Sequence, residues 1–463
     1  MKVRHGAWRG AWRASGTDAA PLEVLRDAAF ESDDHAPQDS PPQALANERE
    51  ANVLLSIFRT HYGRWIGIKE SGEEIWDTNT VRHPLLFTSC CLIATRHSSE
   101  PRPHPEANRL FLQAKEQLSV SLLQIRQPLA FFQAVLILSL WSTTAGQKPL
   151  SLDSWLITGY ALQHSLVAAV FQGHDDRTAS EEFAASSVRN HLCLSHLHAC
   201  ISTRRTAVVT SSDVEKGRQL LNSGGSSNFE TRMVAEFALY WILYEHGISG
   251  TLYLPRAQAA LHEWKREWAG LLDQPRHQLL LMSYSFGQLL MYEQSLSSKS
   301  AAVRESLLSE MLRLSSGIMQ LAIDTADART KHLTDHVYHM IAFTAVTALR
   351  LMSKYGENLQ VGRDVRQMET LICKIVEWLD GIGPDSHTGH IMSDVIKATQ
   401  RKLGPRTSSS TQELSPVLQI EAANLAVPDL FAANTAVFDW DAIIPDWPSL
   451  DSLDVPAHDG NFM

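Results

Sequence analysis

The sequence predicts an all-α protein with a single large helical domain, and three observations indicate this. Apolar residues recur every three or four positions, as at Leu261, Trp264 and Trp268, which is the spacing of a helix with one buried face. Few segments alternate strictly between apolar and polar residues, so little β-sheet is expected. The apolar run from Leu129 to Trp141 is shorter than the roughly 20 residues that cross a bilayer. It therefore predicts a buried core helix and no membrane association.

Composition divides the 463-residue chain into four parts. Residues 1–46 are poor in large apolar side chains and rich in Pro, Ser and Asp near their end, which predicts a disordered N-terminal tail. Residues 47–403 are dense in Leu, Ala, Val and Ile and form the predicted helical domain. Residues 404–410 begin with Gly-Pro and end in three serines, which is typical of a linker. Residues 411–463 form an acidic tail that we expect to be disordered.

The negative charge of the chain is concentrated in that tail. The whole chain has 41 basic and 51 acidic residues, a net charge of −10. From Thr407 to Met463 there are nine acidic residues and no Lys or Arg, which leaves 42 acidic and 41 basic residues in the rest of the chain. A near-neutral body lacks the basic stripe of a nucleic-acid-binding protein. A concentrated acidic end is instead typical of an interaction segment.

Sequence motifs of common enzymes are absent from the chain. There is no Gly-rich phosphate loop, no Gly-x-Ser-x-Gly elbow and no His-Glu-x-x-His helix, so we predict no catalytic residues and no cofactor. His196 and Cys200 are four residues apart and would share a helix face that supplies two zinc ligands. Two ligands do not make a site, and the interleaved Leu194 and Leu197 favour a packing helix, so we predict no metal.

The segment from Asp153 to Gly159 has the pattern of a helix start. Asp153 or Ser154 would cap the free backbone N–H groups of the first turn. Trp155 would anchor that turn in the core, and Gly159 would allow a neighbouring helix to approach closely. We therefore expect Trp155 to be buried.

The tail segment 438–455 interleaves acidic residues with large apolar ones. Prolines at 445 and 448 prevent a long helix there, and this composition is typical of an amphipathic activation segment. The alternative interpretation is a C-terminal segment that docks on its own domain. If the segment binds a partner, the expected contact residues are Phe438, Trp440, Ile443, Ile444, Trp447, Leu450 and Leu453.

A family resemblance is carried by several helices in order. Phe132–Trp141, followed by a short polar loop and by Asp153–Gly159, resembles the middle regulatory region of fungal zinc-binuclear-cluster (Zn2Cys6) transcription factors. His83–Arg96 and Glu263–Trp268 are similar to two further helices of that region, and the activators of secreted-protease genes are the most similar subgroup. The resemblance covers roughly residues 50–350. It implies a nuclear regulator of transcription with a helical regulatory domain, which could itself hold a small-molecule effector.

The resemblance implies partners and one departure from the family. The acidic tail would contact the transcription machinery or a coactivator. The family binds DNA through an N-terminal head whose six cysteines hold two zinc ions, but no cysteine precedes Cys90 here and there is no Cys-x-x-Cys pair. Either the gene model lost an exon, or the protein reaches DNA through a DNA-binding partner. The competing function classes are a soluble helical enzyme or small-molecule-binding protein with a pocket in the helical body, and a scaffold protein.

We predict that this chain alone binds duplex DNA only weakly and without sequence preference. The strength of such binding follows the neutralisation of phosphates by Lys and Arg, and a body with a net charge of −1 supplies little of it. Fluorescence anisotropy titrations at physiological salt, with several unrelated duplexes, measure this directly. Nanomolar and sequence-selective binding would contradict the prediction.

Overall fold

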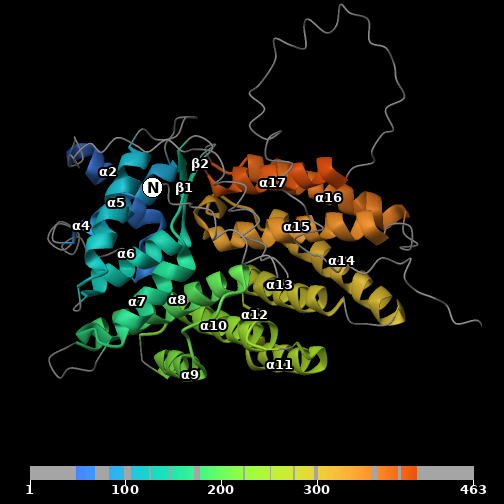
Figure 1. The fold of residues 1–463 in the computed structure, drawn as a ribbon, viewed down its shortest axis with the longest axis horizontal. Coiled ribbons are helices and arrows are strands. Elements are labelled where there is room, and N and C mark those ends of the chain that lie inside the picture. The colour runs from blue at the N-terminus through green and yellow to red at the C-terminus, as the bar shows by residue number, and fades with distance from the viewer. Residues whose placement is uncertain are drawn as a thin grey trace, which may run out of the picture.

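The structure is a computed structural model, and helices dominate the part of the chain that it describes (Figure 1). The predicted N-terminal tail 1–46, the linker 404–410 and the acidic tail 411–463 lie outside the described residues. The all-α prediction is confirmed. No helix in the described part is long and apolar enough to cross a membrane. The described ranges are 48–67, 83–97, 106–124, 127–145, 148–171, 178–222, 225–250, 252–274, 277–296, 301–355, 362–383 and 387–403.

The N-terminal helices, blue to cyan in Figure 1, form one side of the molecule. Helix α4 packs against α2, α5 and α6. The predicted core helix is α6, in which nine of twelve residues are buried. The elements of this side are α2 (Glu48–His61), η1 (Gly63–Ile66), α4 (Pro84–Ala94), η2 (Thr95–His97), α5 (Ala107–Ser121) and α6 (Leu129–Leu140).

The central helices are built around α8, which packs against α6, α7 and α10. Capping boxes fix the starts of α8 and α10, at Thr178 with Glu181 and at Ser227 with Glu230, so that the first backbone N–H groups are satisfied. The elements are α7 (Ser154–Ser165), η3 (Ala169–Phe171), α8 (Ala179–Thr203), α9 (Ser211–Gln219), η4 (Leu220–Asn222), α10 (Asn228–Gly247), α11 (Leu254–Glu267), α12 (Ala269–Leu272) and α13 (Gln278–Ser295).

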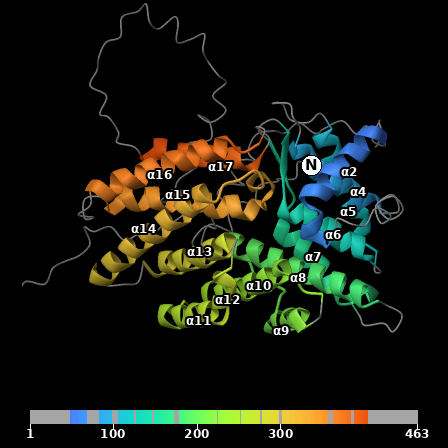
Figure 2. The same ribbon diagram turned by 180° about the vertical axis from the view of Figure 1, so that it is seen from behind.

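The C-terminal helices lie on the opposite side of the molecule from the N-terminal helices (Figures 1 and 2). Helix α15 packs against α14 and α17, and α16 packs against α14 and α17. A short antiparallel hairpin, β1 (Thr143–Ala145) and β2 (Lys148–Leu150), lies between the two sides. The C-terminal elements are α14 (Ala301–Asp324), η6 (Thr330–His332), α15 (Asp335–Tyr355), α16 (Gly362–Asp380) and α17 (Thr388–Leu403).

A buried ion pair joins the two sides. Arg96, at the end of the N-terminal helix pair α4 and η2, is fully buried, and its Nη1 lies 3.1 Å from Oδ1 of Asp335 at the start of α15. The second carboxylate oxygen, Oδ2 of Asp335, accepts hydrogen bonds from the backbone N–H and the hydroxyl of Ser142, at 2.7 and 2.6 Å. Burial by itself lowers the pKa of Arg96, but the nearby Asp335 outweighs it and the pKa is raised. The guanidinium therefore stays charged inside the protein.

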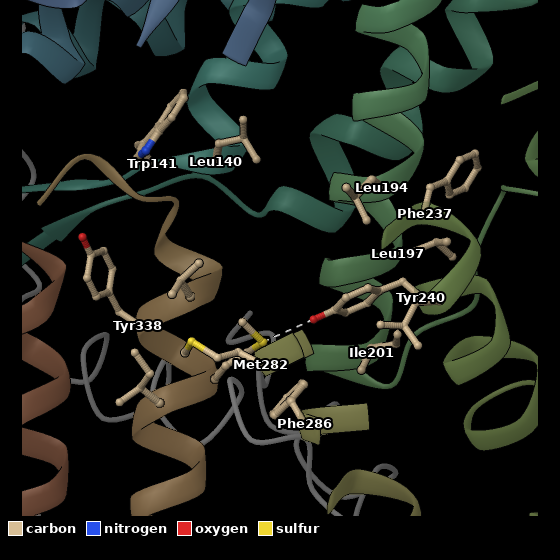
Figure 3. Close-up of a cluster of buried hydrophobic side chains, with 14 of the residues drawn as sticks. Leu140, Trp141, Leu194, Leu197, Ile201, Phe237, Tyr240, Met282, Phe286 and Tyr338 are labelled. Carbon is tan, nitrogen blue, oxygen red and sulfur yellow. Dashed lines mark hydrogen bonds between the residues drawn. The ribbon is translucent and has the colours of Figure 1, made fainter. Parts of the chain in front are cut away.

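Neighbouring side chains support this ion pair from α17 and from the segment before α15. The backbone N–H of Gly389 donates to Nδ1 of His387 at 3.0 Å, and Nε2 of the same ring lies 3.0 Å from Nη2 of Arg96 and 3.0 Å from the carbonyl oxygen of Lys331. Trp141 donates its indole N–H to the carbonyl of Leu333 at 3.0 Å. Trp141 and Tyr338, on opposite sides of this junction, are both labelled in Figure 3. The two sides thus meet through directional polar contacts as well as apolar packing.

We predict that Arg96→Met lowers the free energy of unfolding by about 3–5 kcal/mol, because Asp335 stays buried without its cation. Arg96→Met combined with Asp335→Asn should cost less than the sum of the single changes, since no uncompensated charge remains. Urea unfolding followed by far-UV circular dichroism measures both effects. The matched control is Arg266→Met, which removes an exposed ion pair with Glu263 and should change stability by less than about 1 kcal/mol. Equal stability of the Arg96 and Arg266 variants would contradict a structural role for the buried pair.

Candidate functional site

The candidate site lies at the start of helix α7, where the sequence places Asp153, Ser154, Trp155 and Gly159. Asp153 is the N-cap residue, and its Oδ1 accepts the backbone N–H of Leu156 at 3.2 Å. The hydroxyl of Ser154 donates to the carbonyl of Ser139 in α6 at 3.2 Å. The first turn of α7 is thus capped and tied to the end of the preceding helix.

Asp153 and Trp155 both engage Arg205, just after the end of α8. Oδ2 of Asp153 lies 2.7 Å from Nη1 of Arg205, with both side chains partly exposed. The guanidinium carbon of Arg205 lies 5.1 Å from the centroid of the Trp155 ring, which is within the range of a cation–π contact. The Trp155 indole N–H donates to the carbonyl of Thr206 at 2.9 Å.

The expectation that Trp155 is buried is wrong. The side chain is only partly buried and packs against the edge of the core. The Arg205 cation over the ring favours this place at the surface, because a charged partner is costly to bury in the apolar interior. Tryptophans that do lie in the core include Trp264 of α11, which is 1% exposed and donates its N–H to the carbonyl of Ala235 at 2.8 Å.

His196 on α8 connects α7 to the segment after α8. Its Nε2 accepts the backbone N–H of Val208 at 3.1 Å, so the ring proton is on Nδ1, which donates to Oγ1 of Thr158 at 3.0 Å. The hydroxyl of Thr158 in turn donates to the carbonyl of Ser154. Burial lowers the pKa of His196 to about 4, so the imidazole is neutral at physiological pH and forms this chain of hydrogen bonds without a charge.

These contacts occupy the two residues that the sequence suggested as zinc ligands. Both ring nitrogens of His196 have partners within the protein. Burial raises the pKa of the Cys200 thiol to about 12, so the thiolate that binds zinc is disfavoured. Among the described residues, no group of three or more His, Cys, Asp or Glu side chains is arranged to hold a metal ion. The packing interpretation of this helix is the one that fits its contacts.

Gly159 of α7 faces the ring of His196 on α8. A β-carbon built on Gly159 would lie 3.1 Å from Cε1 of His196, tighter than ordinary van der Waals contact. The four residues singled out from the sequence therefore converge on one clamp between α6, α7, α8 and the 204–210 segment. The sequence analysis did not identify Arg205 and Thr206, which supply the contacts of the clamp to Asp153 and Trp155. The adjacent pair Arg204–Arg205 after a long apolar helix was the available signal, but nothing in the sequence shows that it meets Asp153.

The seven expected contact residues of the tail, 438–453, lie outside the described residues. The candidate site within the helical domain is thus a structural clamp with capping, cation–π and hydrogen-bond contacts. Its acid, Asp153, is held by Arg205, and its imidazole, His196, is held at both nitrogens. This arrangement positions helices and leaves neither group oriented for proton transfer.

Comparison with known proteins then identifies the domain. The chain matches the family described as the middle domain of the transcriptional activator of proteases prtT over residues 44–403. It belongs to this PRTT-like middle-domain family. The match spans α2 to α17, and the resemblance to fungal activators of protease genes is confirmed. No solved structure gives a significant match.

Three relatives show how far the similarity extends. A protein named as an uncharacterized transcriptional regulatory protein of Schizosaccharomyces pombe is 27% identical over 405 residues, which are 83% of this chain and 74% of that protein. The prtT activator of Penicillium rubens is 24% identical over 425 residues, 88% of this chain and 63% of its own length. The prtT activator of Aspergillus clavatus is 26% identical over 359 residues, 75% and 54% respectively. The chain therefore spans between about half and three quarters of the length of these relatives.

We predict that Gly159→Ala destabilises this PRTT-like domain by about 1–3 kcal/mol, the usual cost of overpacking a close contact. The new methyl group would displace His196, whose ring cannot shift without losing the hydrogen bonds to Thr158 and Val208. Gly317→Ala is the matched control, because Gly317 is an exposed residue of α14 with no atom within 4 Å of its built β-carbon.

Thermal unfolding should therefore shift in opposite directions for the two glycine variants. Gly317→Ala should stabilise by up to about 1 kcal/mol, since alanine loses less conformational freedom in a helix. A stabilising effect of Gly159→Ala as well would show that α7 and α8 do not meet as closely as described.

Proposed function

We propose that this chain regulates transcription in the nucleus, with the helical domain as its regulatory part and the acidic tail as an activation segment. The observation that carries the proposal is the family match over 44–403. Relatives that share this region are named as transcriptional regulators or activators of proteases. Those names belong to the relatives, and the target genes of this chain are not part of the proposal.

The composition of the tail supports a contact with a transcriptional partner. Nine of the net ten negative charges lie after residue 406. The acids among them that fall within 438–455 flank large apolar side chains. Repulsion between the acids keeps such side chains accessible, so that they can enter a groove on a coactivator or on the transcription machinery. In the competing arrangement this segment docks on its own domain, and the full chain is then expected to be silent while the tail alone activates. The experiment below distinguishes the two arrangements.

The ion pairs of the helical domain support a role other than direct sequence-specific DNA binding. Several arginines are already engaged by carboxylates of the domain, including Arg96 with Asp335 and Arg189 with Asp213, whose Nη2 and Oδ1 atoms are 2.8 Å apart. Arg218 likewise pairs with Glu267. We therefore propose that sequence-specific DNA contact is made by a zinc-cluster head or by a DNA-binding partner. The enzyme alternative has no comparable support, since the relatives are named as regulators.

The proposal is tested by fusing residues 1–463 to a foreign DNA-binding domain and measuring a reporter gene. The fusion should activate, and removal of 411–463 should abolish activation. Changing Phe438, Trp440 and Trp447 together to Ala should also abolish it, because aromatic anchors commonly contribute about 2 kcal/mol or more each to such interfaces. The control Asp439→Asn should have little effect, since single exposed charges contribute roughly 0–1 kcal/mol.

Three other outcomes have distinct meanings. A fusion that is expressed and nuclear but silent, while residues 411–463 alone activate, would show that the tail docks on its own domain. Silence of both fusions would reject the activation role. Activity that survives loss of all three aromatic residues would keep the role and reject the proposed contact.

A further inference from the structure

Two pairs of stacked imidazole rings connect the start of α15 with helices from the other parts of the domain. His332, in η6 just before α15, stacks on His61 at the end of α2, with 3.9 Å between ring centroids and 14° between ring planes. His336, in the first turn of α15, stacks on His198 of α8, with 3.8 Å and 7° for the same two measures. We call these four residues the histidine junction. It joins one short segment of the chain to both the N-terminal and the central helices.

Face-to-face stacking at this distance suits uncharged imidazoles. His332 is 7% exposed, and the side chain of His198 keeps 12% of its accessible area, so neither ring is well solvated. If both rings of a pair took up a proton, two positive charges would lie less than 4 Å apart with little water between them. Like charges at such a distance disfavour the charged form strongly. A doubly protonated pair therefore favours separation of the two rings.

The surroundings of His61 and His332 make protonation less favourable still. Burial is the largest cause that lowers the pKa of His332 to about 3, and the neighbouring His61 is the next. The positive charges of Lys331 and Arg96 act in the same direction, and Asp327 opposes them. Burial and then Lys331 also lower the pKa of His61. The other titratable groups around this pair, contributed by η1, α15 and α17 and by the residues that flank them, are Tyr62, Asp335, Tyr338 and His387.

The second pair, His198 and His336, is surrounded by groups that do not stabilise a positive charge at pH 6. Burial is the largest cause that lowers the pKa of His336 to about 3 and that of His198 well below its usual value. Oε1 of Glu236 lies 3.8 Å from Nε2 of His198. Burial raises the pKa of Glu236 to about 7, so this acid is mostly protonated at pH 6 and is then no counter-ion. The other titratable groups near this pair, from α8, α10 and α15, are His191, Arg232, Tyr240 and His339.

We propose that the histidine junction is a pH-sensitive contact, which releases the start of α15 from α2 and α8 when the pH falls from 7.5 to 6 while α4 and α6 stay packed. In the released state the rings are in water and take up protons below about pH 6.5, as ordinary histidines do. In the stacked state they stay neutral. Because the released state binds more protons, its population rises as the pH falls. The proposal concerns the packing of the domain and does not depend on the tail or on its role in transcription.

The size of the effect follows from the histidines and from Glu236, which acts against them. An imidazole that titrates near pH 6.5 when released, and only below about pH 4 when stacked, raises the opening equilibrium constant about fourfold between pH 7.5 and pH 6. His198, His332 and His336 each act in this direction. Glu236 loses a proton on release, since its pKa is raised to about 7 in the packed state, and lowers the constant about eightfold. The three histidines outweigh it, and the net increase is about sevenfold.

The test is hydrogen–deuterium exchange of the full chain at pH 7.5 and pH 6, with rates corrected for the intrinsic pH dependence of exchange. Protection of the first half of α15 should fall about sevenfold at pH 6, and α4 and α6 should keep theirs. His198→Phe and His332→Phe keep an aromatic ring in each stack but cannot take up a proton. Each should reduce the fall about fourfold, and the double variant should abolish or reverse it. His262→Phe, at an exposed position of α11, is the control and should leave the fall unchanged.

Phenylalanine is a close replacement at position 198. Among the described residues, Nε2 of His198 has no hydrogen-bond partner, so the substitution removes no hydrogen bond of that atom. If a phenylalanine variant fails to fold by circular dichroism, glutamine takes its place at the same position, because its side chain is polar and uncharged at both pH values.

Three results would overturn the proposal. The first is protection of α15 that is equal at the two pH values. The second is a fall in protection that stays at the wild-type size in His198→Phe and in His332→Phe. The third is an equal loss of protection in α4, α6 and α15, which would show unfolding of the whole domain at pH 6 in place of the release of α15. Failure of the reporter experiment would leave these measurements unaffected.

Discussion

The ion pair between Arg96 and Asp335 is the constraint on which the arrangement of the domain depends. Arg96 follows the N-terminal helix α4, and Asp335 begins the C-terminal helix α15, so this charged contact joins the two sides of the molecule. A buried pair contributes little net stability, but loss of either partner is strongly destabilising. Ser142, just before β1, donates two hydrogen bonds to the carboxylate, and Nε2 of His387 lies 3.0 Å from Nη2 of Arg96. Segments far apart in the sequence therefore meet around this one pair.

Helix α8 is the second organising element, and it uses neutral histidines at two different places. His196 joins α7 to the segment after α8, with both ring nitrogens occupied. His198, on another face, stacks on His336 of α15 beside Glu236. Burial keeps both rings uncharged. One helix thus places neutral imidazoles in two separate groups of contacts, one with α7 and one with α15.

The clamp at Asp153, Trp155 and Arg205 holds α7 and α8 together at the molecular surface. His198, by contrast, contacts the rings of Tyr240 on α10 and His336 on α15. The two faces of α8 therefore join it to different parts of the domain, one to the helix before it and the other to the central and C-terminal helices.

The sequence alone determined the features that depend on neighbouring residues. Helical spacing of apolar residues predicted the all-α fold, and the length of one apolar run predicted the buried helix α6. The cap of α7 was predicted to be Asp153 or Ser154, because capping and amphipathic faces are local properties. The order of several short helix patterns was sufficient to indicate the family. Tertiary structure decided what depends on contacts between distant segments. Arg96 and Asp335 are in contact, although most of the domain's sequence lies between them. Arg205, which follows the end of α8, contacts Trp155 at the start of α7. Trp155 is partly exposed because its ring and its N–H find partners at the surface. A sequence shows which side chains a helix carries, but only packing decides what each of them faces.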